Sequence, residues 1–131
     1  MIREKITALL CALLLLFCAF ALMNTRRTHD RMKERVRQTL AVVPPTEPSE
    51  GQAARTAQAV DDLCRAWERE RRLVSTYSRH DELERVSEDM QRLRPLCESG
   101  DYGELRLKLH DIDASLDHLL DTELPTLTNI L

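Results

Sequence analysis

The sequence predicts an all-α protein in which a single transmembrane helix precedes a small antiparallel bundle of about three helices. Three observations carry this prediction. An uninterrupted apolar run stands near the start of the chain, apolar residues recur every three or four positions through most of the remainder, and residues that favour strands are scarce. With 131 residues, of which 43% are hydrophobic, the chain has room for one modest domain beyond the apolar run.

The apolar run Ile6–Met23 contains no charged residue over 18 positions. As a helix it would extend about 27 Å at ~1.5 Å per residue, which is close to the hydrocarbon thickness of a bilayer. We therefore expect an N-terminal tail at residues 1–5 and a transmembrane helix at residues 6–23. The alternative is a signal peptide cleaved after Ala21, because Ala19 and Ala21 satisfy the small-x-small rule, although the run continues past that point.

Charge is unevenly distributed along a chain whose formal net charge is −3. Residues 24–43 carry six basic side chains against two acidic ones, and the residues beyond them are acidic overall. The basic stretch could lie against anionic lipid headgroups, or it could be a solvated helix that keeps the apolar run in place. The acidic remainder argues against nucleic acid as a partner, because duplex binding depends on neutralising phosphates.

We expect residues 24–43 to form a basic amphipathic helix next to the membrane, since apolar residues recur there at helical spacing. Residues 44–52 hold three prolines and a glycine, a composition typical of a semi-rigid linker. The bundle is expected at residues 53–121, followed by a C-terminal tail at 122–131. Its helices are predicted at about 53–78, 80–98 and 102–121.

Each predicted bundle helix has an apolar stripe that needs partners. Pro95 should kink the second helix or end its regular part. Gly100 should close that helix, and Asp101 and Glu104 read as a capping box that opens the next. The stripes are Ala53, Ala57, Val60, Cys64, Trp67 and Val74, then Leu83, Val86, Met90, Leu93 and Cys97, then Tyr102, Leu105, Leu109, Ile112, Leu116 and Leu119.

Cys64 and Cys97 allow two interpretations. If the first two bundle helices turn near residue 79 or 80, the two thiols sit at similar heights on inward stripes, and a disulfide is conceivable in an oxidising compartment. The alternative is a pair of reduced, buried, small hydrophobes.

Polar residues of the third bundle helix form a possible cation site. His110, Asp113, Asp117 and Asp121 share one stripe beside the apolar face, and imidazole and carboxylates at helical spacing can hold a divalent cation. The same residues describe an ordinary solvated flank, which we favour because the second helix offers no matching ligands. The sequence therefore predicts neither a metal nor another cofactor.

The sequence also predicts a protein that is not an enzyme. His80 stands beside two acids, but at a helix start, where acids are favoured by the helix dipole. Trp67 is expected to anchor the core with its indole N–H bonded to a partner. Standard phosphate-loop, nucleophile-elbow and zinc-site motifs are absent from the sequence.

A few marked positions are spaced in a recognisable way. Trp67 is followed thirteen residues later by His80, which opens a helix with the letters HDEL, and the chain ends with LLDTELPTLTNIL, which includes Glu123 and Asn129. These features resemble the bacterial family known as domain of unknown function 4363. The resemblance implies a short envelope protein with an N-terminal membrane helix, a helical remainder, and a body outside the cytoplasmic membrane.

We therefore expect a non-enzymatic, membrane-anchored interaction or scaffolding module of a bacterial envelope complex. Its partners would be the lipid bilayer and another protein, such as a multi-span membrane protein, and copies of the chain could self-associate as a coiled coil. The alternative is a membrane-tethered sensor that binds an ion or small ligand through its acidic head. The positive-inside rule favours a cytosolic body, because two basic residues precede the apolar run and six follow it.

Overall fold

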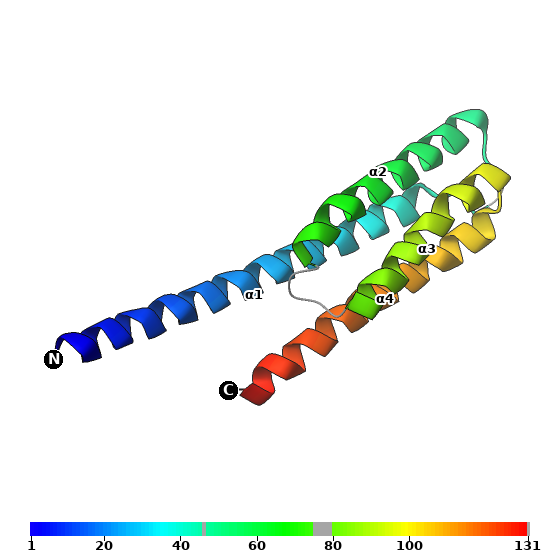
Figure 1. The fold of residues 1–131 in the computed structure, drawn as a ribbon. Helices are drawn as coiled ribbons and strands as arrows, with labels where there is room; N and C mark the ends of the chain where they lie inside the picture. The colour runs from blue at the N-terminus through cyan, green and yellow to red at the C-terminus, as the bar shows by residue number, and fades with distance from the viewer. Residues whose placement is uncertain (46, 75–79, 131) are drawn as a thin grey trace.

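The computed structural model describes the backbone at residues 1–45, 47–74 and 80–130, and the side chains of these residues up to Leu119 apart from 73 and 74. Over these ranges the chain is helical with no strand, so the predicted all-α class is confirmed (Figure 1). The helices are α1 Ile2–Val42, α2 Glu50–Val74, α3 His80–Ser99 and α4 Tyr102–Ile130.

The four helices form an up-down-up-down bundle in which consecutive helices are neighbours (Figure 1). α1 packs against α2 and α4, and α3 packs against the same two helices, so the packing closes into a ring. The C-terminal half of α1 thus adds a fourth helix to the three that the sequence predicts at 53–121. The N-terminal half of α1 and the C-terminal end of α4 extend beyond the same end of the bundle.

α1 is one continuous helix that contains three of the segments predicted separately. Its helical conformation begins at Ile2, so most of the expected tail at 1–5 is helical, and no glycine or proline interrupts it before Val42. Every side chain from residue 1 to 20 is exposed, and α1 is the only described helix long and apolar enough to cross a membrane. Burial begins at Thr28.

The end of α1 is set by a proline and held by α4. Val43 is extended, with φ −66° and ψ 119°, because Pro44 disfavours helical backbone in the preceding residue. The Val43 carbonyl oxygen then accepts a hydrogen bond of 2.9 Å from the guanidinium of Arg106 on α4. A carbonyl that the end of α1 leaves without a helical partner is thereby satisfied.

α2 begins at Glu50, three residues earlier than predicted, because Ser49 and Gln52 form a capping box. The Ser49 N–H donates to Gln52 Oε1 at 3.2 Å, and the Gln52 N–H donates to Ser49 Oγ at 3.4 Å. The predicted linker at 44–52 is correspondingly shorter. The sequence carries this signal as Ser-x-x-Gln, which our prediction, based on the prolines and the glycine of the segment, did not use.

The connection between α3 and α4 follows the prediction. α3 ends at Ser99 with Gly100 in the left-handed conformation, at φ 75°, and the Asp101 N–H donates to the Leu96 carbonyl at 3.1 Å. The Glu104 N–H donates to Asp101 Oδ1 at 3.3 Å, which caps α4.

The ends of α3 and α4 compare differently with the prediction. α3 continues through Pro95 to Ser99, so of the two effects expected of Pro95 it does not end the helix. α3 packs against α2 and α4, and such tertiary packing overrides the local preference of a proline. The predicted end of α4 at residue 121, with a tail at 122–131, is wrong, because α4 continues to Ile130.

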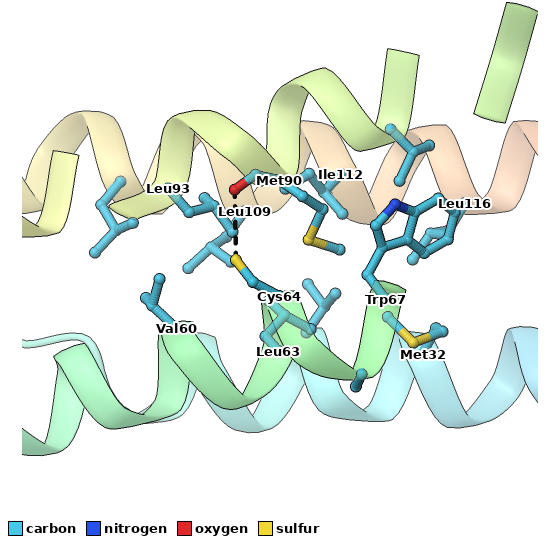
Figure 2. Close-up of a cluster of buried hydrophobic side chains, with 14 of the residues drawn as sticks. Met32, Val60, Leu63, Cys64, Trp67, Met90, Leu93, Leu109, Ile112 and Leu116 are labelled. Atoms are coloured by element: carbon cyan, nitrogen blue, oxygen red, sulfur yellow. Dashed lines mark hydrogen bonds between the residues drawn. The ribbon is translucent and has the colours of Figure 1, made fainter. Parts of the chain in front are cut away.

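The core runs along the axis of the bundle and centres on Trp67, which is 1% exposed (Figure 2). The predicted stripes of α3 and α4 are confirmed, because their Leu, Val, Ile and Met residues are buried. The stripe of α2 is rotated from its predicted position, with Ala57 exposed and Thr56 and Ala66 buried. α1 contributes Met32, Val36 and Val43.

Candidate functional site: the polar layer where α1 enters the bundle

Polar side chains gather at the level where α1 passes from solvent exposure into the bundle. They come from three helices that converge at this end. We call this set the junction layer. It consists of the side chains of Thr28, His29, Arg31 and Lys33 on α1, Glu70 on α2, and Asp113 and Asp117 on α4, together with the backbone carbonyl of Leu116 on α4.

His29 joins α1 to α4 from a buried position, with 8% of the residue exposed. Its Nε2 lies 2.5 Å from the Leu116 carbonyl oxygen. Because a carbonyl only accepts, Nε2 is the nitrogen that carries the proton. The other nitrogen, Nδ1, has no hydrogen-bond partner and lies 3.7 Å from the Asp30 carboxylate. Leaving a buried polar atom unpaired costs about 1–3 kcal/mol, so the layer carries some local destabilisation.

Two basic residues of α1 form ion pairs with acidic residues of other helices in the bundle. The Lys33 ammonium contacts the Asp117 carboxylate and lies 3.8 Å from Asp113 Oδ1, and the Lys33 side chain is only 16% exposed. Arg31 lies 3.5 Å from the largely buried Glu70 of α2. Because these pairs point to two different helices, they fix the rotation of α1 about its own axis.

The predicted cation stripe is divided by this arrangement. Asp113 and Asp117 are brought together, but around Lys33, while His110 is exposed. The side chain of Asp121 lies outside the described residues. Within the part of the chain that the structure describes, no three His, Cys, Asp or Glu side chains are placed to hold a metal ion.

The disulfide between Cys64 and Cys97 is not formed, and both thiols are free. The reason is the register of α2 against α3. The Cys64 thiol donates to the Met90 carbonyl at 3.5 Å (Figure 2), which places Cys97 seven residues, or about 10 Å of helix, further along. Our prediction, with the turn near residue 79 or 80, would bring Cys97 opposite Cys64, whereas the observed register brings Met90 there.

Burial governs the chemistry of these two thiols. Desolvation raises the pKa of Cys64, which is 8% exposed, against a smaller opposing effect of the Arg94 guanidinium. Desolvation also raises the pKa of the half-buried Cys97, and the nearby Glu98 adds to the shift. Both thiols therefore stay protonated at neutral pH, as expected for small core hydrophobes.

The structure describes the side chains of only some of the positions that carry the family resemblance. The Trp67 indole N–H donates to Ser87 Oγ at 2.9 Å, so its predicted role as a core anchor with a bonded N–H is confirmed. His80 is exposed at the start of α3, 3.8 Å from Glu84. Glu123 and Asn129 lie in the last part of α4, and their side chains are outside the described residues.

Sequence reasoning missed His29, although a signal for it existed. His29 stands three residues before Met32 and seven before Val36, so it continues the apolar stripe of α1 by one turn. A polar residue on such a stripe is expected to be buried and paired. The predicted stripe of this helix contained only the apolar residues Met32, Val36, Leu40 and Val43.

A surface groove lies between α2 and α3, away from the junction layer. It has a volume of about 440 Å³, and its lining includes the thiol-bearing Cys64, the Ser87 that binds Trp67, and three arginines. Two of these arginines, Arg65 and Arg94, bind the carboxylate of Asp61, at 3.1 and 2.8 Å. The complete lining is Cys64, Arg65, Glu68, Arg69, Ser87, Met90, Gln91 and Arg94.

A comparison of the chain with models of known protein families gives one match. The model of the family described as Domain of unknown function (DUF4363) matches residues 30–130. The chain belongs to this family. No curated protein and no solved structure matches the chain.

The extent of the DUF4363 match agrees with the architecture. It begins at Asp30, next to the first buried residues of α1, and covers the junction layer except Thr28 and His29, together with the other three helices. It leaves out the exposed apolar half of α1. The four-helix bundle is thus the unit that corresponds to DUF4363, and the residues previously assigned to a basic juxtamembrane helix are its first helix.

Proposed function

We propose that this DUF4363 protein is a non-enzymatic, single-pass membrane-anchored module that holds a helical interaction surface close to a bacterial membrane. The carrying observation is the continuity of α1, which leads without a break from an exposed apolar segment into the core of the bundle. A scaffold needs its binding surface held at a fixed distance from the membrane, and a continuous helix provides this.

The membrane span is supported by exposure as well as by composition. Large apolar side chains such as Leu14 and Phe17 are 64% and 60% exposed, whereas the other described helices bury theirs against one another. A mostly apolar segment that is exposed on all sides, as residues 6–20 are, would be costly in water, at about 25 cal/mol for each Å². A bilayer removes that cost, and Arg26 and Arg27 follow within about one turn, at the level of the headgroups.

We propose further that the bundle lies outside the cytoplasm. The charge argument for a cytosolic body depends on the basic residues further from the apolar run, among them Arg31 and Lys33, which pair with acids of α2 and α4 in the bundle. Close to the apolar run, Arg26 and Arg27 on one side are matched by Arg3 and Lys5 on the other. The resemblance to envelope proteins then favours the outer side.

Topology can be tested with reporters at both ends of the full chain. Alkaline phosphatase fused after the bundle should be active, and green fluorescent protein at the same site should be dark, if the bundle is exported. The reverse pattern would place the bundle in the cytosol. Activity that is released from membranes after processing would support the cleaved signal peptide.

The groove between α2 and α3 is the surface we assign to a protein partner. Its lining includes the buried Met90 and the exposed, positively charged Arg69. Such a combination suits an acidic or carboxylate-bearing segment of another envelope protein, for instance a loop of a multi-span membrane protein. Self-association of the bundle is the other source of a partner surface.

Site-specific photo-crosslinking in intact host cells tests this assignment. A benzophenone amino acid replaces Arg69 in one variant and Arg55 in a matched control, which is exposed on the same helix but outside the groove. We expect one discrete crosslinked product from position 69, identified by mass spectrometry, and none of that size from position 55. The absence of both a heterologous and a self-crosslinked product at position 69 would remove the scaffold proposal's main support.

The alternative function is a membrane-tethered sensor of an ion or a small ligand. The same continuity of α1 supports it, since a shift in the bundle would be carried to the membrane along a rigid helix. The acids that might have bound an ion are partly used by Lys33, so a ligand would have to occupy the groove instead. A ligand-dependent increase in the melting temperature of the full chain would favour this alternative.

A further inference from the structure

The groove between α2 and α3 has an internal acid at one end. The Asp61 carboxylate binds two arginines of the groove lining, Arg65 and Arg94. We propose that Asp61 is a built-in competitor for a partner's carboxylate, and that the partner is an extended acidic segment with two acids about four residues apart. This inference rests on the proposed binding role of the groove, and it adds the form of the partner and the residue that opposes its binding.

Asp61 holds Arg94 in the way that a carboxylate ligand would. Its two oxygens bind different guanidinium groups, Oδ1 that of Arg94 at 2.8 Å and Oδ2 that of Arg65 at 3.1 Å. The pair with Arg94 crosses from α2 to α3 at the end of the groove. The side chains of Asp61 and Arg94 are 33% and 53% exposed, so another carboxylate can reach this pair and exchange with Asp61.

The pair also lies beside the wall of the groove. Burial raises the pKa of the Cys64 thiol, which belongs to the lining, while the Arg94 guanidinium lowers that pKa and the Asp61 carboxylate raises it. Both charges are therefore close enough to act on an atom of the lining. An acid bound in the groove would reach the same guanidinium that Asp61 now holds.

The other end of the groove carries an arginine in a different state. Arg69 is exposed, and among the described residues its side chain has neither an ion pair nor a hydrogen bond. Glu68 is the one acid of the lining against three arginines, so the lining as a whole attracts anions. A partner with one acid would bind Arg69 alone, whereas a partner with a second acid must take Arg94 from Asp61.

The register of α2 against α3 sets the spacing of the two acids. Asp61 and Arg94 lie opposite each other, and the two helices run antiparallel (Figure 1). The hydrogen bond between Trp67 and Ser87 gives the same register to within one residue. Arg69 is eight residues further along α2 than Asp61, or roughly 12 Å of helix. An extended chain covers that length in about four residues, at ~3.3 Å each.

An NMR titration of the full chain in dodecyl maltoside micelles tests this inference. The probe is the end-blocked peptide Glu-Ser-Ser-Ser-Glu, with Gln-Ser-Ser-Ser-Gln as its uncharged control and Glu-Glu-Ser-Ser-Ser as a control of equal charge. The indole N–H of Trp67, the one tryptophan of the chain, gives the readout, because it donates to the lining residue Ser87. Circular dichroism checks the fold of each variant.

We expect Asp61→Asn to bind Glu-Ser-Ser-Ser-Glu at least about threefold more tightly than the wild-type chain, because the competing ion pairs are gone. The matched variant Asp62→Asn removes the same charge from a residue that accepts from Gln58 and pairs with no arginine among the described residues, so its affinity should stay within about twofold. Adding Arg94→Gln should abolish most of the gain. Asp61→Ser repeats the measurement if Asp61→Asn loses helicity.

The outcomes separate this inference from the function on which it rests. Equal affinities of Asp61→Asn and Asp62→Asn, with binding weakened by Arg69→Gln but not by Arg55→Gln, would overturn the competitor and leave the groove as a carboxylate site. Equal binding of Glu-Glu-Ser-Ser-Ser would overturn the spacing of the two acids. If Arg69→Gln weakens binding in no background, or the uncharged peptide binds equally well, the acidic partner of the groove is overturned as well.

Discussion

The two halves of α1 belong to the same helix yet meet opposite surroundings. Residues 1–20 are exposed on every side, whereas the half after Thr28 buries one stripe against α2 and α4. The first half is apolar all round and the second has polar residues between its core positions. Local helix formation is the same in both halves, so the comparison shows that the distribution of apolar residues decides which stretch packs into the bundle and which stays exposed.

Arginine in the first half should have the largest effect. Replacing Leu10 and Leu14 together by arginine is expected to raise the free energy of membrane insertion by about 6 kcal/mol, at roughly 3 kcal/mol for each leucine near the helix centre. The fraction of protein that resists carbonate extraction measures this change. Leu107→Arg combined with Ala57→Arg, both exposed on the bundle, should leave that fraction unchanged.

Loss of a bulky aromatic should affect only the bundle. Trp67→Ala is expected to lower the free energy of unfolding by about 3–5 kcal/mol, because it empties a fully buried site and leaves the Ser87 hydroxyl without its indole partner. Urea unfolding followed by circular dichroism in detergent measures the loss. Phe17→Ala, in the exposed half of α1, should change that free energy by less than about 0.5 kcal/mol. Equal losses in the two variants would contradict the division of α1.

Lys33 joins the start of the buried half of α1 to α4 through two carboxylates. Lys33→Ala should cost about 1–2 kcal/mol of bundle stability, between the values for surface and buried pairs, because Asp113 and Asp117 would be left together without a cation. The matched variant is Arg37→Ala, whose ion pair with Glu34 is well exposed, and it should cost no more than about 0.5 kcal/mol. Raising the salt concentration should affect the exposed pair more than the partly buried one.

Thiol reactivity gives the smallest effect and reports on the bundle alone. Folding raises the pKa of Cys64 and Cys97, so the folded state holds these protons more tightly than the unfolded state does. At pH 7 alkylation by iodoacetamide should be slow at Cys97 and slower still at Cys64. It should accelerate as the pH rises above the ordinary thiol value of 9.0.

The same linkage makes the bundle less stable at high pH. The unfolded chain releases its thiol protons first, so stability is retained below the unfolded pKa and falls as the pH rises above it. Peptide mass spectrometry under non-reducing conditions measures the extent of alkylation at each of the two thiols. A peptide containing both residues in disulfide linkage would contradict the register of α2 against α3.

Local chemistry explains what could be predicted for the fold. Pro44 ends α1, and Gly100 with Asp101 forms the turn before α4, because each acts on its immediate neighbours. The stripes of α3 and α4 were predictable because spacing within one helix fixes which residues share a face. The junction layer was not predictable, since Lys33 and Asp117 are 84 positions apart in the chain.

The sequence by itself determined that the chain is helical, where α1 ends, where α3 begins and ends and where α4 begins, and that one stretch is apolar enough for a membrane. Tertiary structure alone decided that α1 enters the bundle as a fourth helix, that Cys64 faces the Met90 carbonyl rather than Cys97, and that Lys33 binds two acids of α4. The physical reason is that helical periodicity fixes the face of a helix but not its position along a neighbour. That sliding register is set by packing of side chains from distant parts of the chain.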